Sequence, residues 1–422
     1  MAIYKSFSIK LNCWYFLTNL KKEETVNKLV NVLTTTDIHG FISNEGQPPA
    51  LALQGIKEKY PNSLLMDSGD FFVGNPLTTY FCDQMQVSPM VDYANKVGFD
   101  VMVPGNHDFD HGLNYLKRQV SHLNADYVCC NVFDEEGNWI FPPSTIKEID
   151  GIKVGVIGLL TSRMSMISDF DVTTGVVVKE ALPELQKQVA ALRDQVDLIL
   201  VGYHGGIERD LRTHDETNYA TGEDETFKLV SQTPGIDGFS CGHQHRINHG
   251  QIGDTLVVQG GYRGNCFGHM TFEFNDQNEI VKRQEEIVLT ETLPAKIGNF
   301  YSEEDYQNWL AEDFDLSHLV EFLKQKFARE HLGIFISLKG KTRQQVIDSF
   351  TIPYGVRIYR LTSSEYQVFS QQDWALKQEN YDSNAHDFLV LTNSYEVPEY
   401  RLTDQFVDNI FDEYSYYLTQ RN

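Results

Sequence analysis

Five short segments of this 422-residue chain carry side chains that are typical metal ligands, and each segment follows an apolar, strand-like run. The segments are TTTDIHG (34–40), DSGD (67–70), GNHD (105–108), GYHGG (202–206) and CGHQH (241–245). Together they supply Asp37, His39, Asp70, Asn106, His107, His204, His243 and His245. A single histidine beside glycine is usually a turn residue. Five such segments at strand ends predict a site for two neighbouring divalent cations.

The mixture of ligand types indicates which cations and which chemistry to expect. Imidazole nitrogen suits Zn, Mn or Fe better than Mg or Ca. A carboxylate such as Asp70 could bridge two cations roughly 3.5–4 Å apart, while Asn106 would ligate without adding charge. A hydroxide held between the two cations could then attack phosphorus in line. The residues therefore predict a metal-dependent phosphoester hydrolase.

His107 is the candidate for proton transfer, because it stands beside Asn106 and is followed by Asp108. An aspartate that accepts a hydrogen bond from an imidazole ring favours the charged ring. We expect His107 to stabilise developing charge or to protonate the leaving oxygen. Asp67 is instead expected to be a hydrogen-bonding group at a strand end. Structural roles are expected for His111, His122, His214, His249 and His269.

The elements that must position these residues are short strands alternating with amphipathic helices. Strands are expected at 29–33, 63–66, 101–103, 153–159, 198–201, 238–241 and 255–259, and helices at 50–60, 89–97 and 182–195. Ser88 is a plausible N-cap for the second helix, with Pro89 at its first position. This alternation predicts an α/β domain with a largely parallel sheet. Ligand sites in such domains form outside the carboxyl ends of the strands.

Composition restricts the partners. The formal net charge of −24 argues against a nucleic-acid polymer, because polyanion binding needs clustered Lys and Arg. No apolar run is long enough to span a bilayer, so no membrane partner is expected. The six cysteines show no CxxC pair and are expected to be reduced. Residues 1–27 are interpreted as an N-terminal extension without a convincing signal peptide, which predicts a cytoplasmic protein.

The rest of the chain divides into two parts. Residues 28–290 form the predicted metal-binding domain, and residues 291–422 form a smaller α+β domain that is rich in aromatics. In the second part we expect helices at 316–327 and 404–417 and strands at 357–361 and 388–391.

The longer motifs resemble the calcineurin-like metallophosphoesterases, in particular the 5′-nucleotidase and 2′,3′-cyclic-nucleotide phosphodiesterase branch. The resemblance lies in TTTDIHG, DSGDFFVGNP, VPGNHDFDHG, GYHGGIERD, PGIDGFSCGHQHR and VVQGGYRGNCFGH, and covers residues 31–270. It implies a four-layer α/β/β/α sandwich built on two sheets. It also implies one metal on Asp37, His39, Asp70 and His245, and a second on Asp70, Asn106, His204 and His243. His107 and Asp108 would be the catalytic pair, and the metals would be Mn, Zn, Fe or related ions.

The second domain departs from the family pattern, in which it clamps the nucleobase. IPYGVRIYRLTSSEY (352–366) and FLVLTNSYEVPEY (388–400) resemble the two clamp segments in part, but the usual glycine run is replaced by Glu396, Val397 and Pro398. Tyr354 and Tyr400 could stack on a base or could simply be packing residues. Arg263 could orient a phosphate or could play a structural role.

The leading hypothesis is hydrolysis of nucleotides, either 5′-monoesters or 2′,3′-cyclic diesters, which makes a small phosphorylated molecule the expected partner. Two alternatives stay open at this point. The same ligands could serve a phosphatase of other small metabolites, or the metal domain could be a non-catalytic scaffold.

Overall fold

The computed structural model describes most of the first domain and parts of the second. The described residues are 28–42, 49–164, 174–217, 221–293, 299–315, 317, 321, 323, 332–349, 356–372, 374–378, 387–393 and 402–407. Among these residues no helix is long and apolar enough to cross a membrane.

The first sheet has six strands in the order β14-β13-β1-β2-β3-β4. Their bounds are β1 Lys28–Thr35, β2 Ser63–Asp67, β3 Val101–Met102, β4 Asp126–Tyr127, β13 Cys266–Phe274 and β14 Ile280–Leu289. Strands β1 to β4 are parallel, and β13 and β14 are antiparallel to their neighbours. Thr35 of β1 pairs with Asp67 of β2, and Asp67 pairs with Met102 of β3. The three parallel strands therefore end at the same level, which brings the loops that follow them to one edge.

The second sheet also has six strands, in the order β11-β12-β10-β9-β7-β6. Their bounds are β6 Ser144–Ile149, β7 Ile152–Leu160, β9 Leu198–His204, β10 Gly238–Cys241, β11 Ile247–Ile252 and β12 Thr255–Gly260. The four central strands are parallel, whereas β6 and β11 add antiparallel edges. The parallel strands expected from sequence thus divide between two mixed sheets.

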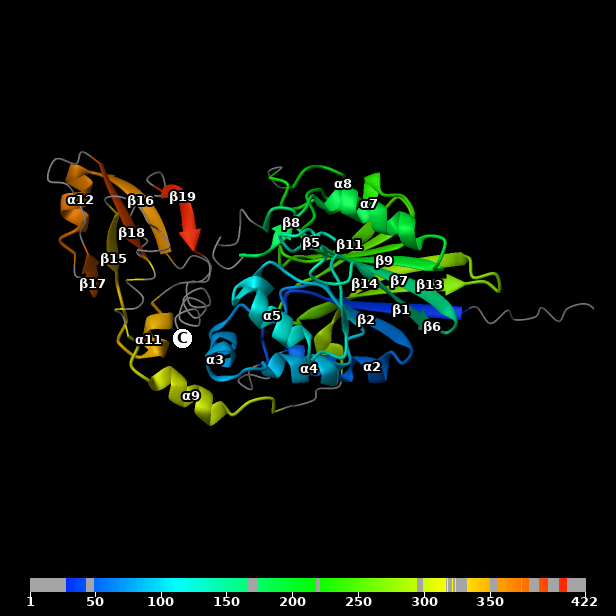
Figure 1. Ribbon diagram of the computed structural model, residues 1–422, viewed down its shortest axis with the longest axis horizontal. Helices are drawn as coiled ribbons and strands as arrows, with labels where there is room; N and C mark the ends of the chain where they lie inside the picture. The colour runs from blue at the N-terminus through cyan, green and yellow to red at the C-terminus, as the bar shows by residue number, and fades with distance from the viewer. Residues whose placement is uncertain are drawn as a thin grey trace, which may run out of the picture.

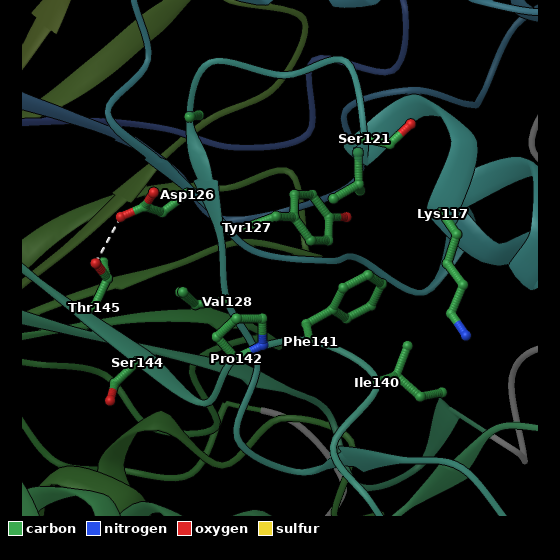
Figure 2. A pocket seen from close by; sticks show the side chains of 12 residues that line it. Lys117, Ser121, Asp126, Tyr127, Val128, Ile140, Phe141, Pro142, Ser144 and Thr145 are labelled. Atoms are coloured by element: carbon green, nitrogen blue, oxygen red, sulfur yellow. Dashed lines mark hydrogen bonds between the residues drawn. The ribbon is translucent and has the colours of Figure 1, made fainter.

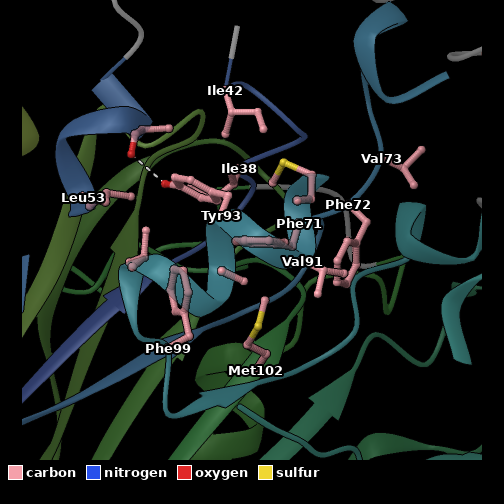
Figure 3. Close-up of a cluster of buried hydrophobic side chains, with 14 of the residues drawn as sticks. Ile38, Ile42, Leu53, Phe71, Phe72, Val73, Val91, Tyr93, Phe99 and Met102 are labelled. Carbon is pink, nitrogen blue, oxygen red and sulfur yellow. Dashed lines mark hydrogen bonds between the residues drawn. The ribbon is translucent and has the colours of Figure 1, made fainter. Parts of the chain in front are cut away.

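The two sheets and the helices that cover their outer faces form four layers, and a hydrophobic core lies between each pair of adjacent layers. The inner strands are therefore buried on both faces. In β1, Val30 and Val32 lie in the core between the two sheets, and Leu33 lies in the core beneath the helices of the first sheet. Figure 3 shows part of that second core, with Phe71 and Tyr93 packed together. A third core joins the second sheet to its own helices. The α/β/β/α sandwich is confirmed (Figure 1).

The helices of these outer layers follow the expected pattern in part. On the first sheet they are α1 Pro49–Ala52, α2 Ile56–Lys59, α3 Pro76–Gln84, α4 Pro89–Val97 and α5 Gly112–Val120, and on the second α7 Ala181–Leu192 and α8 Thr226–Gln232. Helix α4 has the predicted bounds, and the Ser88 side chain accepts a hydrogen bond from the Met90 N–H. The helix expected at 50–60 is interrupted by a 3-10 turn, Leu53–Gly55.

The second domain contains a five-stranded sheet in the order β17-β15-β18-β16-β19. The strands are β15 Leu332–Ile336, β16 Val356–Thr362, β17 Leu376–Gln378, β18 Asp387–Thr392 and β19 Leu402–Val407, with helices α11 Arg343–Ile347 and α12 Ser363–Phe369. The helix predicted at 404–417 is wrong at its start, because 402–407 pair with β16 as an edge strand. Residues 408–422, and most of the helix predicted at 316–327, lie outside the described residues.

Helix α9, Glu303–Ala311, follows the first domain in sequence and packs against it. Its Trp309 belongs to the same core as Tyr80, and the two ring centroids are 5.5 Å apart. Tyr301 packs on Phe81 with centroids 5.5 Å apart. The first part of the segment after residue 290 is therefore packed into the core of the first domain (Figure 1).

Candidate metal centre

The predicted ligands all lie at or just beyond the carboxyl ends of parallel strands, and they come from both sheets. Asp37 and His39 follow β1, Asp70 follows β2, Asn106 and His107 follow β3, His204 ends β9, and His243 and His245 follow β10. The two edges are joined directly, because the Ser68 hydroxyl donates to the Ser240 hydroxyl oxygen at 2.8 Å.

One cluster contains Asp37, His39 and His245, whose ligand atoms lie within 4.8 Å of one another. The Nε2 atoms of His39 and His245 are 3.0 Å apart. Asp37 Oδ1 lies 3.4 Å from His245 Nε2 and 3.7 Å from His39 Nε2. Two imidazole nitrogens and a carboxylate oxygen thus converge on one point, which is the donor set that a transition-metal dication prefers.

A second cluster contains Asp70, His204 and His243, again with ligand atoms within 4.8 Å of one another. Asp70 Oδ2 lies 3.1 Å from His204 Nε2 and 3.7 Å from His39 Nε2, so this carboxylate reaches both clusters. The buried side-chain oxygen of Asn106, Oδ1, has no hydrogen-bond partner. Buried polar atoms are normally satisfied, so this unpaired acceptor fits a site built to hold a cation.

The other nitrogen of each ring fixes its orientation. His39 Nδ1–H donates to the Val73 carbonyl at 2.7 Å, and His204 Nδ1–H donates to the Ser68 carbonyl at 2.8 Å. The Nε2 atom of each ring is therefore directed toward the carboxylates. His243 differs, because its Nε2 contacts the Glu223 carboxylate at 2.6 Å. Such outer hydrogen bonds set the tautomer of metal-binding histidines.

The loops that carry these residues adopt a backbone conformation that L-residues rarely use. Ten non-glycine residues of the described chain have positive φ, and six of them are predicted site residues. The six are Asp37, His39, Asp70, His243, His245 and Arg263. Left-handed backbone at non-glycine positions costs free energy and persists where surrounding contacts enforce it. Because six such residues occur in the site, the ligand geometry is obtained at a cost in the stability of the fold.

His107 lies beside the first cluster, with its ring centroid 5.7 Å from that of His39. Its backbone N–H donates to Asp70 Oδ1 at 2.9 Å, which ties it to the shared carboxylate. Its ring contacts Asp110, with Nδ1 2.8 Å from Oδ2. The side chain keeps 27% exposure, so the ring can reach a substrate.

Asp108 is not the ring partner that the sequence suggested. Its carboxylate is fully buried and accepts four backbone N–H groups instead. The donors are Asp70 at 3.1 Å, Phe71 at 3.0 Å, Phe72 at 2.8 Å and Gly105 at 2.8 Å. The expected contact between His107 and Asp108 is wrong, because Asp108 turns inward to hold the Asp70 loop. Asp110 takes its place, three residues beyond His107 and directly after the 3-10 turn His107–Phe109.

The charges in the site favour binding of a positive ion. Burial alone would raise the pKa of Asp70, but the neighbouring His204 and His107 hold that pKa well below its usual value. Burial opposes charge on His204 as well, yet Asp70 and Asp37 raise the pKa of that ring to about 9. Burial dominates at His39 and lowers its pKa to about 4. Without metal, the second cluster thus holds a proton on His204 where a cation would otherwise balance the carboxylates.

The amino-acid sequence matches a known family over half of the chain. The family described as calcineurin-like phosphoesterase matches residues 30–247, which include every predicted metal ligand. The chain belongs to this family.

Individual relatives of this calcineurin-like phosphoesterase support the same grouping. A 2′,3′-cyclic-nucleotide 2′-phosphodiesterase/3′-nucleotidase of Yersinia enterocolitica is 27% identical over 245 residues, covering 52% of this chain and 36% of the relative. A 5′-nucleotidase of Vibrio cholerae is 29% identical over 190 residues, covering 42% and 34%. The chain thus spans about a third of the length of these two curated relatives.

Solved structures agree on the fold. A Staphylococcus aureus protein provisionally named 5′-nucleotidase, crystallised with alpha-ketoglutarate, superposes with a TM-score of 0.66 at 20% identity, covering 94% of this chain and 97% of that one. The phosphoesterase YfkN from Bacillus subtilis gives 0.57 at 21% identity, covering 67% and 95%.

Arg263 of this phosphoesterase lies at the rim of the first cluster. Its backbone N–H donates to the Asp37 carbonyl at 2.7 Å, which places it beside a predicted ligand. Its guanidinium carbon lies 3.8 Å from the centroid of the Phe41 ring and 5.1 Å from that of Tyr262. Tyr262 in turn stacks on His245, with centroids 5.0 Å apart. Among the described residues, the contacts of this side chain are therefore with aromatic faces and not with a carboxylate.

Other predictions have mixed outcomes. Asp67 accepts hydrogen bonds from the Thr35 hydroxyl and the Gly69 N–H, as expected for a strand-end group. His269 contacts Asn31 and Glu286, also as expected for a structural histidine. Tyr354 and Tyr400 lie outside the described residues. Sequence reasoning missed Asp110 and Glu223, although the three-residue spacing from His107 could have indicated the first.

A cavity of about 600 Å³ lies between α5, β4 and residues 140–145. Figure 2 shows Tyr127, Phe141 and Ile140 on its apolar side and Lys117 at its margin. None of the predicted metal ligands lines it. The cavity is therefore distinct from the metal centre.

Proposed function

We propose that this chain is a two-metal phosphoester hydrolase that acts on nucleotides, as a 5′-nucleotidase or a 2′,3′-cyclic-nucleotide phosphodiesterase. The observation that carries the proposal is the convergence of two three-residue clusters around one shared carboxylate, Asp70. A single structural metal needs only one closed set of about four ligands, whereas two adjacent sets are typical of phosphoester hydrolysis.

Each cation has a proposed set of ligands. The first set comprises Asp37, His39, Asp70 and His245, and the second comprises Asp70, Asn106, His204 and His243. The buried, unpaired oxygen of Asn106 supports its place in the second set. The imidazole-rich donor sets favour Mn, Zn or Fe over Mg or Ca.

The reaction divides between the cations and the protein. When bound, two such cations supply an activated water for in-line attack and neutralise charge on the phosphoryl oxygens. His107 provides a proton donor at the open side of the first cluster, and it protonates the leaving oxygen. Asp110 orients the ring by its contact with Nδ1. Asp108 keeps Asp70 in place through the backbone of its loop.

The substrate class rests on the relatives and on Arg263. Relatives named as nucleotidases and cyclic-nucleotide phosphodiesterases match the half of the chain that carries the clusters. Arg263 is proposed to bind a substrate phosphate, because its stacked guanidinium has a fixed direction and phosphate accepts bidentate hydrogen bonds. Tyr354 and Tyr400 are proposed to contact the base. The domain limits of 28–290 and 291–422 belong to the same proposal.

The test is phosphate release from a panel of substrates. Protein stripped with a chelator is reloaded with Mn, Zn or Fe and offered 5′-nucleotides, 2′,3′-cyclic nucleotides and sugar phosphates. We expect turnover of nucleotides that requires metal and falls strongly in His107→Ala. Turnover of sugar phosphates alone would contradict the substrate class. If protein loaded with two metals hydrolysed none of these phosphoesters, the proposal that the chain is a phosphoester hydrolase would be contradicted.

A further inference from the structure

Glu223 touches the metal centre although no motif includes it. Its Oε1 lies 2.6 Å from His243 Nε2. The His243 side chain is 14% exposed and that of Glu223 is 32% exposed, so the contact is largely shielded from water. Glu223 lies 20 residues before His243 in the chain, in a loop without a regular pattern.

The backbone beneath Glu223 is fixed, so this contact differs from a loose surface ion pair. The Glu223 carbonyl accepts hydrogen bonds from the Thr161 hydroxyl at 2.8 Å and from the Tyr203 hydroxyl at 3.2 Å. Thr161 directly follows β7, and Tyr203 lies within β9, which are two adjacent strands of the second sheet. Glu223 is thus anchored to the sheet that carries His204 and His243.

The next residue repeats the arrangement. Asp224 Oδ2 accepts a hydrogen bond from the Gln244 side chain at 2.7 Å, so two successive acids pair with two successive residues of the CGHQH loop. Gln244 also accepts a hydrogen bond from the Ile207 N–H at 2.9 Å. The acidic segment therefore aligns the loop on which two predicted ligands stand.

We propose that Glu223 is a positioning residue that fixes the tautomer and rotation of the His243 ring, so that Nδ1 faces Asp70 and His204. The inference rests on the proposed function, because it assigns His243 to the second cation. With Nε2–H donated to Glu223, the only lone pair left on the ring is at Nδ1. A carboxylate partner of this kind also makes imidazole a stronger ligand.

This role makes His243 depend on a side chain in a way that His39 of the first cluster and His204 of the second do not. His39 and His204 are held by backbone carbonyls, which no single substitution removes. His243 is held by a carboxylate, which a substitution can remove. Loss of Glu223 should therefore lower the affinity of the protein for one of the two cations, by about 10–100-fold, and leave the affinity for the other unchanged.

The experiment measures metal binding rather than turnover. Metal-free protein is titrated with Zn or Mn against a competing chromophoric chelator, which resolves two binding steps. The variants are Glu223→Ala and Glu223→Gln, and the thermal midpoint of each is recorded. Glu286→Ala is the matched control, because Glu286 contacts the ring of His269 at 3.0 Å outside both clusters.

We expect Glu223→Ala to weaken one step by about 10–100-fold and to leave the other unchanged. Glu223→Gln should lose less, because its amide oxygen still accepts the ring N–H. Glu286→Ala should bind like the unmodified protein. Unchanged binding by Glu223→Ala overturns the positioning role, and so does equal weakening of both steps with a lower thermal midpoint. Fewer than two equivalents in the unmodified protein would instead overturn the proposed function, and the role of Glu223 with it.

Discussion

Asp108→Asn gives a quantitative test of the structural role assigned to this carboxylate. Each carboxylate oxygen accepts two backbone N–H groups, those of Phe71 and Phe72 on Oδ1 and those of Asp70 and Gly105 on Oδ2. Asparagine keeps one acceptor oxygen and replaces the other with a donor. Two buried N–H groups then lose their partners. At about 1–3 kcal/mol for each, the free energy of unfolding should fall by about 2–6 kcal/mol.

Urea unfolding of metal-free protein, followed by circular dichroism, measures this change in the transition of the larger domain. Metal-free protein is used so that weakened cation binding does not add to the result. Asp134→Asn is the control, because Asp134 is an acid that accepts hydrogen bonds from Asn138 within an exposed turn. An Asp108→Asn protein with unchanged stability and abolished turnover would refute the reasoning, since Asp108 would then act in the reaction and not beneath it.

Three further outcomes are expected. His107→Ala and Asp110→Asn should each lose turnover while still binding two metals. Chelator competition measures the metal content, and loss of a metal in either variant would indicate that the substituted residue is a ligand. In metal-free protein the thermal midpoint should decrease as the pH is raised from 6.5 to 9. The raised pKa of His204 stabilises the fold below pH 6.5, and this stabilisation is lost as pH rises through about 9. The decrease should be smaller in His204→Asn, and an equal decrease in that variant would contradict the reasoning. A Cβ at Gly105 would lie 2.0 Å from Asp70 Oδ1. Gly105→Ala should therefore displace Asp70 by about 1 Å and reduce kcat by about 100-fold in phosphate-release assays, and near-normal turnover would count against the shared carboxylate.

The grouping of the ligands was predictable because it depends on strand ends. Parallel strands of equal reach bring their following loops together, so Asp37 and Asp70 could be placed without knowing any side-chain direction. The division of the strands between two sheets was not visible in the pattern. A strand buried between two layers has the same apolar character in either sheet.

Contacts that depend on side-chain direction escaped the sequence. The 3-10 turn after Asn106 points Asp108 inward and Asp110 toward the His107 ring, and adjacent positions in a sequence carry no such information. Glu223 was hidden for a different reason, since its partner lies 20 residues away. The prediction of a helix from residue 404 was wrong because the apolar spacing there suits a helix, whereas residues 402–407 pair with β16 as a strand.

Both clusters draw on both sheets, and this has a consequence for how the protein matures. The carboxylates Asp37 and Asp70 arise early in the chain, whereas His204, His243 and His245 come more than a hundred residues later. Neither half of the sandwich alone can offer a complete cage to an ion. Tight uptake of the cations is then a late event that reports correct docking of the two halves. A molecule in which the two halves dock incorrectly would not bind the cations, and it would have no metal-dependent activity until folding is complete.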